Sequence, residues 1–360
     1  MYYKGVKILT FKRWRHPVGR LARAELIVVL ALLTVGLSLT WLAIDSYWED
    51  NHETSLSRGV QPSWYRSLDL AQARQVSYTN TPMTVAKALA PDGAVKRQII
   101  SFDVPKDGLQ EYGLMTEPSS KPPKQGFPVI ILCHGFANPQ SYSTTNAYLS
   151  DMLFYSQHGF AVIKPDYRGQ GISILEGTPD GAYYSMSYNT DVLSLITAVR
   201  KTHGLNKNDI NLWGHSMGAY IALRAAVLSP YIKKAVLLSG PVGSFEDMFA
   251  DYNVISDMSN GQAATVKADI INTDGTPLSN PGFWEKASPI NYLAYSKTDF
   301  QVHVGAADKI VPPKFSAELN SRLNELKEAH AYYVYAGATH GLVAQRPQIW
   351  QRSLAFYTTR

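Results

Sequence analysis

The feature that most constrains this 360-residue chain is the pentapeptide GHSMG at residues 214–218. It directly follows a short apolar stretch, and it opens a run of residues with the composition of a helix. A serine in the pattern G-x-S-x-G between a strand and a helix occupies a strained turn, in which the flanking glycines, here Gly214 and Gly218, let other backbone pass close by. The pattern therefore predicts that Ser216 holds its hydroxyl group above a sheet edge. The N–H of Met217, at the positive end of the helix, is the expected donor to negative charge on a reaction intermediate.

Two later segments supply the partners that a serine nucleophile needs. An apolar strand near residue 300 ends in a loop that contains Asp308, and a strand near residue 331 ends in a loop that contains His340. Such a hydroxyl group becomes reactive when a histidine takes its proton and a carboxylate orients that histidine. Taken singly, Asp308 is also suited to cap the helix that begins near Pro313. Because serine, acid and histidine follow in this order at three strand ends, the sequence predicts a triad of Ser216, Asp308 and His340.

An unbroken apolar run at residues 127–133 predicts a strand that is covered on both faces. In the loop after it, the backbone N–H of Phe136 is the expected second donor to the oxyanion, and His134 is expected to brace the loop. Asp166 and Arg168 follow the next predicted strand and are expected to form a structural pair. No residue of these loops is expected to bind a metal, because no Cys and His grouping has metal-ligand spacing.

The whole chain shows the alternation of an α/β fold. Strands are expected near residues 97–104, 109–117, 128, 160, 210, 234, 300 and 331, and helices near 146–157, 187–202, 217–229, 313–327 and 345–358. This alternation predicts an eight-stranded, mostly parallel sheet with helices on both faces. An insertion from about 242 to 287 has helical spacing, and it is expected either to form a small cap over the pocket or to pack as an ordinary helix.

Several motifs extend the pattern beyond the pentapeptide. They are DYRGQG at 166–171, Asp191-Val192 at the start of a helix, SPI at 288–290, Asp308 followed by Val311-Pro312, and GATHG at 337–341. With these motifs, residues 97–360 resemble the α/β-hydrolase superfamily, and most closely the catalytic domain of the prolyl oligopeptidase family. Ala219 stands where those peptidases commonly have a further glycine, and the segment before residue 97 is too short for the β-propeller that they commonly carry. The resemblance therefore implies an acyl hydrolase, with esters as the first expected substrates and short peptides as the second.

The N-terminal part of the chain carries a different signal. Residues 26–44 contain no charged side chain and are long enough to cross about 30 Å of hydrocarbon as a helix. Seven basic residues precede this stretch: Lys4, Lys7, Lys12, Arg13, Arg15, Arg20 and Arg23. The positive-inside rule predicts a basic cytoplasmic tail at 1–24, an uncleaved signal anchor at 25–45, a stalk at 46–96 that packs on the domain, and a catalytic domain at 97–360 on the periplasmic or extracellular side. A cleaved signal peptide and a buried helix are the alternatives.

Charge excludes one class of partner. Without the first 25 residues, the chain has 27 Lys and Arg against 28 Asp and Glu, so the overall charge of +5 belongs to the N-terminal tail. A nucleic-acid site is therefore not expected. A cofactor is not expected either, because no glycine-rich phosphate loop precedes a helix and no Cys and His grouping has metal-ligand spacing. The sequence predicts a serine hydrolase that cleaves a carboxylic ester, or a related acyl bond, through an acyl-enzyme. A prolyl oligopeptidase-like peptidase that acts on short peptides and a catalytically silent binding protein with a hydrolase fold are the alternatives.

Overall fold

The computed structural model describes residues 68–139, 141–175, 185–251, 268 and 271–359. The chain divides into two units, residues 1–61 and 62–360, and every described residue lies in the second. Among the residues described, none of the helices is long and apolar enough to span a bilayer. The predicted basic tail, the predicted span at 26–44 and the first part of the predicted stalk lie outside the described residues.

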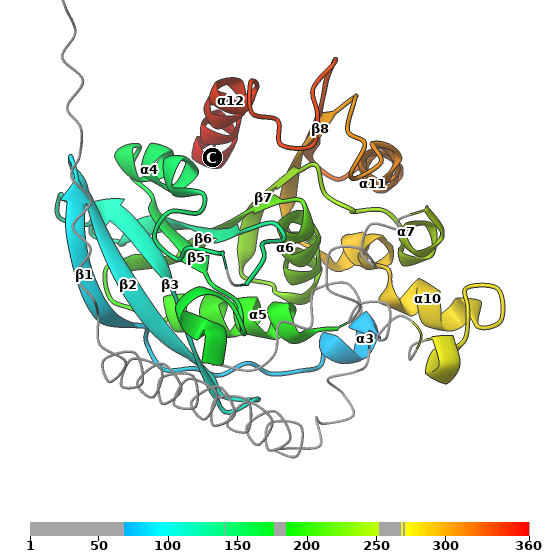
Figure 1. Ribbon diagram of the computed structural model, residues 1–360, viewed down its shortest axis with the longest axis horizontal. Helices are drawn as coiled ribbons and strands as arrows, with labels where there is room; N and C mark the ends of the chain where they lie inside the picture. The colour runs from blue at the N-terminus through cyan, green and yellow to red at the C-terminus, as the bar shows by residue number, and fades with distance from the viewer. Residues whose placement is uncertain (1–67, 140, 176–184, 252–267, 269–270, 360) are drawn as a thin grey trace, which may run out of the picture. The chain divides into compact units, whose positions relative to one another are not determined.

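One twisted sheet of nine strands organises the domain (Figure 1). The strands are β1 (Thr84–Asp92), β2 (Val95–Val104), β3 (Leu109–Pro118), β4 (Phe127–Cys133), β5 (Ala161–Pro165), β6 (Leu205–His215), β7 (Ile232–Leu238), β8 (Asp299–Gly305) and β9 (His330–Tyr335). Their order across the sheet is β1-β2-β3-β5-β4-β6-β7-β8-β9. The pairs from β1 to β5 are antiparallel, and the pairs from β5 to β9 are parallel. The carboxyl ends of the parallel strands therefore meet at one edge.

The prediction of eight strands is wrong, because the sheet has nine. Strand β1, which the sequence analysis placed in the stalk, pairs with β2 at the margin of the sheet, and Thr84 Oγ1 lies 2.7 Å from Ser101 Oγ across the pair. Eight of its nine residues are exposed, so it lacks the alternation of apolar and polar residues by which a half-buried strand is recognised. It also contains Pro91, which is tolerated at a sheet edge but weakens a strand prediction.

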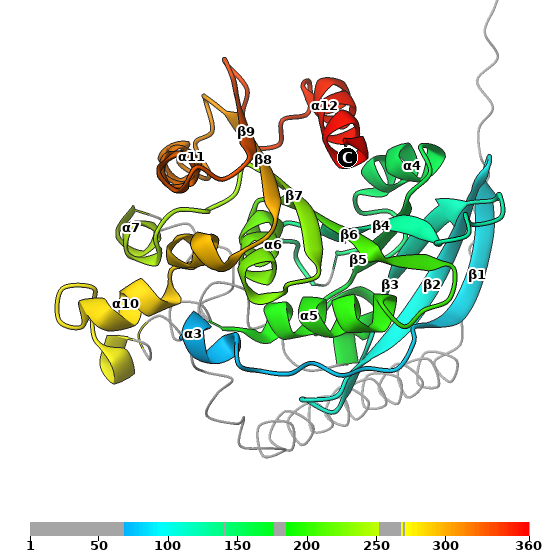
Figure 2. The ribbon, with the colours of Figure 1, turned by 180° about the vertical axis from the view of Figure 1, so that it is seen from behind.

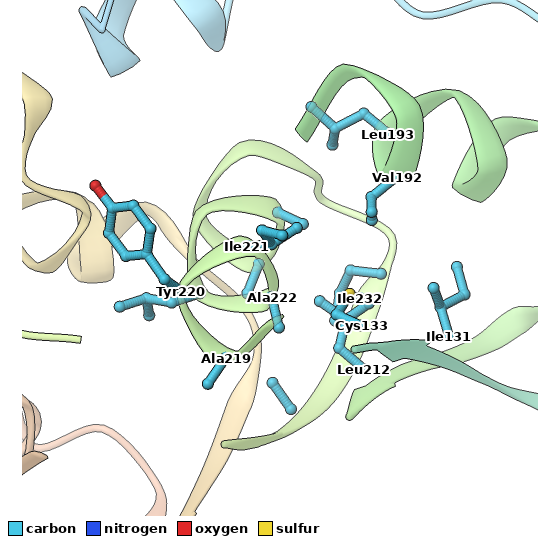
Figure 3. Packing of buried hydrophobic residues seen from close by; sticks show 14 of the residues in the cluster. Ile131, Cys133, Val192, Leu193, Leu212, Ala219, Tyr220, Ile221, Ala222 and Ile232 are labelled. Atoms are coloured by element: carbon cyan, nitrogen blue, oxygen red, sulfur yellow. The ribbon is translucent and has the colours of Figure 1, made fainter. Parts of the chain in front are cut away.

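Helices cover both faces of the sheet, as predicted. Helices α5 (Ser187–Val199), α6 (Met217–Leu228) and α11 (Lys314–Leu326) pack on one face, while α4 (Leu149–Gln157) and α12 (Arg346–Thr358) pack on the other (Figures 1 and 2). The assignment of faces follows the two-residue period of a strand: along β4, Ile131 and Cys133 join the first core, whereas Ile130 and Leu132 join the second. Figure 3 shows the first core, in which Ala222 of α6 and Val192 of α5 lie over Ile131 and Cys133.

Helix α6 is the central helix of the domain. All of its residues except Leu228 are buried, and it contacts β4, β6 and β7. Its one charged side chain, Arg224, is also buried and donates to the carbonyl oxygen of Ser185 at 3.0 Å. The position of the helix is therefore fixed by buried contacts on all sides. Its first residue, Met217, therefore begins at a defined height above the carboxyl edge of β6.

The predicted insertion at 242–287 contains helices α7 (Phe245–Asp251) and α10 (Pro281–Ala287). The indole of Trp284 is fully buried, and its ring centroid lies 5.0 Å from that of Phe245 and 4.5 Å from that of Phe249. These two helices thus share one small aromatic core. Upstream of the sheet, Leu68 and Leu70 at the helix α3 (Leu70–Ala73) are also buried in the main core.

Candidate active site

Ser216 lies in the turn between β6 and α6, at the centre of the parallel part of the sheet. Its backbone has φ 56° and ψ −126°, a conformation that a residue with a side chain adopts only under constraint. The constraint is visible in the two glycines of the motif. A Cβ on Gly218 would lie 2.0 Å from the carbonyl oxygen of Cys133, and a Cβ on Gly214 would lie 2.4 Å from the carbonyl oxygen of Gly218. The glycines therefore permit the close contact of β4, β6 and α6 that forces Ser216 into its turn.

The structure brings the three predicted side chains together. His340 Nε2 lies 2.9 Å from Ser216 Oγ, and His340 Nδ1 lies 2.9 Å from Asp308 Oδ2. A carboxylate only accepts hydrogen bonds, so Nδ1 carries the ring proton and Nε2 accepts the hydrogen bond from the serine hydroxyl. Ser216 is 8% exposed and the His340 side chain 15%, so both are largely buried and keep a small contact with solvent.

Asp308 faces His340 and does not cap the following helix, because α11 (Lys314–Leu326) has no side-chain hydrogen bond at its N-terminus. Its Oδ1 accepts the backbone N–H groups of Ile310 and Val311, both at 2.9 Å, while its Oδ2 faces His340. Burial alone would raise the pKa of Asp308, but the hydrogen bond from His340 and those from the two N–H groups outweigh it and lower the pKa. The carboxylate therefore remains ionised at neutral pH beside the imidazole.

The two predicted oxyanion donors belong to two segments that lie next to the serine. Met217 is the first residue of α6, where the N–H groups lack acceptors within the helix and carry its positive end. The loop after β4 passes directly beside the serine, because a Cβ on Gly135 would lie 3.2 Å from Ser216 Cβ. Phe136 is the next residue of this loop, and its side chain is 39% exposed.

His134 braces this loop from beneath, as predicted. Its ring is fully buried, stacks on Tyr142 at 4.6 Å between centroids, and places Nδ1 2.7 Å from the carbonyl oxygen of Gly135. Burial, together with the charge of Lys164, lowers the pKa of His134 to about 3, so the ring is neutral. The ring nitrogens lie against the backbone carbonyl oxygens of Gly135 and Asp166, so the ring supports the loop.

The predicted pair of Asp166 and Arg168 is wrong. Asp166 Oδ2 instead accepts the hydroxyl of Thr144 at 2.6 Å, and Arg168 forms an ion pair with Asp107 at 2.7 Å. Arg168 also pairs with Asp191. The side chains of residues 166 and 168 contact different loops, so their closeness in sequence does not make them partners.

The sequence analysis missed two residues beside the site. His215, within the pentapeptide itself, contacts the hydroxyl of Tyr148 with Nδ1 at 2.8 Å and the carbonyl oxygen of His340 with Nε2 at 3.1 Å. The only signal in the sequence was that His215 neighbours Ser216; nothing pointed to Tyr148, because it comes from another loop. Within the described part of the chain, no cluster of three or more His, Cys, Asp or Glu side chains is arranged to hold a metal ion.

Comparison with known proteins agrees with this geometry. Residues 128–280 match the family model described as the alpha/beta hydrolase fold. This chain has the α/β-hydrolase fold. The structure of an acetyl xylan esterase from Paenibacillus sp. R4 has a TM-score of 0.58 with this chain at 18% identity, over 80% of this chain and 91% of that one. Dipeptidyl peptidase 4 from Porphyromonas gingivalis has a TM-score of 0.53 at 15% identity, over 79% of this chain and 36% of that one.

A curated relative of the hydrolase domain is the acylamino-acid-releasing enzyme of Homo sapiens. It is 24% identical over 243 residues, which make up 65% of this chain and 31% of the human enzyme. The chain thus spans about a third of the length of the curated relatives it matches. The resemblance that the motifs implied is confirmed, and the names of these proteins agree with the expectation of a hydrolytic enzyme.

Proposed function

We propose that this protein is a serine hydrolase that cleaves a carboxylic ester through an acyl-enzyme on Ser216. The observation that carries the proposal is the continuous line of hydrogen bonds from Ser216 Oγ through His340 to Asp308, with both distances at 2.9 Å. A serine hydroxyl in this arrangement has a base positioned to take its proton and a carboxylate positioned to stabilise the charged base.

The proposed reaction proceeds in two halves. Ser216 Oγ attacks the carbonyl carbon while its proton passes to His340 Nε2, and the N–H groups of Met217 and Phe136 hold the resulting oxyanion. The tetrahedral intermediate then expels the alcohol, which takes the proton from His340, and an acyl-enzyme remains. In the second half, a water molecule gives its proton to His340 and attacks the acyl carbon, and the acid leaves as the proton returns to Ser216.

Asp308 serves this cycle without changing its own charge. Its lowered pKa keeps it anionic while His340 is protonated, so the imidazolium always faces a negative partner. Its second oxygen is held by the N–H groups of Ile310 and Val311, which prevents the carboxylate from turning away. The hydrogen bond to Nδ1 then keeps the unprotonated Nε2 directed at Ser216.

An ester is proposed as the first substrate class and a short peptide as the second. The chain shares its fold with an acetyl xylan esterase and with a dipeptidyl peptidase. Sequence identity to the acylamino-acid-releasing enzyme supports the second candidate, a peptidase that acts on short peptides. A catalytically silent binding protein is disfavoured, because binding alone would not require Ser216, His340 and Asp308 to be aligned.

A substrate panel tests the choice between these activities. The full chain is assayed against p-nitrophenyl esters of increasing acyl length and against aminoacyl and prolyl p-nitroanilides. We expect ester turnover that is lost in Ser216→Ala and retained in Ser229→Ala, a serine of equal exposure at the other end of α6. Turnover of anilides with inert esters would favour the peptidase, and turnover that survives Ser216→Ala would refute the assignment of the nucleophile.

We also propose that residues 26–44 anchor the protein in a membrane, with the hydrolase domain on the side opposite the cytoplasm. The charge-free stretch and the basic residues before it support this topology. The single cysteine, Cys133, is buried, so a thiol reagent would label only a cysteine introduced at the exposed Ser120. We expect a membrane-impermeant maleimide to label Ser120→Cys in intact spheroplasts and not the wild type. Labelling that requires lysis would refute the proposed orientation.

A further inference from the structure

One histidine outside the proposed triad joins the two loops that form the site. The His215 ring lies between the hydroxyl of Tyr148, 2.8 Å from Nδ1, and the carbonyl oxygen of His340, 3.1 Å from Nε2. The Tyr148 hydroxyl in turn accepts the backbone N–H of Gly135 at 3.1 Å. We call this chain of contacts, from the Gly135 N–H through Tyr148 and His215 to the His340 carbonyl, the His215 bridge.

The partners of the bridge determine where each proton lies. A carbonyl only accepts, so the hydrogen bond to His340 places a proton on Nε2 of His215. Burial, together with the neighbouring His340 and Arg346, lowers the pKa of His215 to about 3, so the ring carries no second proton at neutral pH. Nδ1 therefore accepts the O–H of Tyr148, whose oxygen still has a lone pair for the N–H of Gly135. Every donor in the bridge then has one acceptor.

A charged His215 would be incompatible with the site. It would have two donors and no acceptor for the Tyr148 hydroxyl. It would also place a second positive charge beside His340, whose ring centroid lies 5.1 Å away and which becomes protonated in the proposed cycle. The neutral form of His215 therefore leaves His340 as the only ring of the pair that takes up a proton.

We propose that His215 and Tyr148 are positioning residues, which hold the oxyanion loop and the backbone of His340 at fixed places relative to Ser216. The inference rests on the proposed function. Gly135 immediately precedes Phe136, the proposed oxyanion donor, and His215 immediately precedes Ser216. One ring thus couples the donor, the base and the nucleophile, whose relative placement within less than 1 Å decides the rate of a reaction of this kind.

The competing explanation is that the bridge is an ordinary buried polar contact, which contributes to stability alone. The chain offers a matched control in Tyr155, seven residues further along, whose hydroxyl lies 2.6 Å from Ser353 Oγ. That contact joins α4 to α12 and does not include a residue of the proposed triad. Tyr148→Phe and Tyr155→Phe each remove one hydroxyl group from a buried hydrogen bond, and only the first lies in the bridge.

The first test compares these two variants in ester hydrolysis by the full chain. We expect Tyr148→Phe to lower kcat for p-nitrophenyl acetate by about ten-fold or more while KM changes less than two-fold, because the substrate still binds but the reacting groups are misaligned. Tyr155→Phe is expected to keep kcat within two-fold of the wild type, even if its melting temperature falls by as much as that of Tyr148→Phe. Equal kcat values for Tyr148→Phe and the wild type would overturn the proposal.

The second test is rescue at His215. Glutamine keeps one donor and one acceptor, whereas leucine keeps neither. We therefore expect His215→Gln to retain at least ten-fold more activity than His215→Leu. Equal activity of the two variants would mean that the hydrogen bonds of the ring do not position the site, and would overturn the proposal.

A third measurement separates this inference from the proposed function. The ¹⁵N shifts of histidine-labelled full chain, with His215→Gln used for assignment, report protonation without any substrate. We expect a neutral His215 with its proton on Nε2 between pH 6 and 8, and a changed Nδ1 shift in Tyr148→Phe. A wild type that cleaves none of the acyl substrates would refute the proposed function, while a proton on Nδ1 of His215 would refute the bridge.

Discussion

The strained turn at Ser216 predicts an unusual order of stability among its variants. With φ 56° and ψ −126°, Ser216 occupies a conformation that glycine adopts without steric cost. Ser216→Ala keeps the Cβ, and thus the strain, whereas Ser216→Gly removes both. Because each variant loses the same hydroxyl group and its hydrogen bond to His340, the comparison isolates the backbone.

The size of the effect follows from two opposing terms. A residue held in a sparsely populated backbone region destabilises the folded state by about 1 to 3 kcal/mol. Glycine loses more backbone entropy on folding than alanine, which offsets about 0.4 to 1 kcal/mol of that relief. We therefore expect Ser216→Gly to be about 0.5 to 2 kcal/mol more stable than Ser216→Ala.

The assay is urea unfolding of the full chain, followed by the fluorescence of the buried Trp213 and Trp284. Ser229 supplies the control, because it follows the last residue of α6, is equally buried, and has an ordinary extended backbone with φ −109° and ψ 124°. At that position, Ser229→Gly is expected to be less stable than Ser229→Ala by about 0.4 to 1 kcal/mol.

The two pairs of variants should therefore differ in opposite directions. If Ser216→Gly were less stable than Ser216→Ala by as much as the pair at Ser229, the turn at Ser216 would hold no strain. The account of how Gly214 and Gly218 force the nucleophile above the sheet would then fail. The slope of unfolding free energy against urea should be the same in all four variants, which checks that each unfolds as the wild type does.

Three further predictions address the same domain. Gly218→Ala should lower the free energy of unfolding by about 3 kcal/mol or more, because its Cβ would lie 2.0 Å from the carbonyl oxygen of Cys133. In the control Gly282→Ala, where the new Cβ has nothing within 4 Å, the free energy of unfolding should rise by up to about 1 kcal/mol, and urea titration of both variants measures the difference. Asp308→Asn should lower kcat for esters by about 10³-fold. Because the pKa of Asp308 is lowered in the folded state, the wild type should lose stability below about pH 4 more steeply than this variant, and thermal melts at each pH measure the difference. Burial, with nearby arginines, lowers the pKa of His303 to about 3, so the unfolded chain takes up this proton first as the pH falls below about 6.5. His303→Gln should therefore reduce the loss of stability between pH 6 and 4 by about 1.4 kcal/mol per pH unit. An unchanged slope of stability against pH would contradict this prediction.

The part of the fold that the sequence predicts best is the part that is buried. The strand at 127–133 is apolar throughout and helix α6 is almost entirely buried, and both occupy the positions that their sequences imply. Strand β1 was missed because its apolar and polar residues do not alternate, so its sequence does not show the two-residue period of a strand. Its pairing with β2 is decided by backbone hydrogen bonds, which do not depend on the side chains.

The site shows a similar division. The meeting of Ser216, Asp308 and His340 could be anticipated, because parallel strands deliver their carboxyl ends to one edge and each residue follows such an end. The contacts of Asp166 and Arg168 could not, since their side chains reach loops whose course no local pattern encodes. The role of Tyr148 could not be predicted for the same reason, because its hydroxyl contacts His215, which lies 67 residues further along the chain.

The most direct test of the central claim is covalent labelling by a fluorophosphonate, followed by mass spectrometry of the digested protein. The phosphorus reagent is attacked only by a serine whose proton has been taken by a base. We expect one adduct per full chain, on the peptide that contains Ser216, and no adduct in Ser216→Ala or His340→Ala. A folded wild type that remains unmodified, or an adduct located on another residue, would contradict the account.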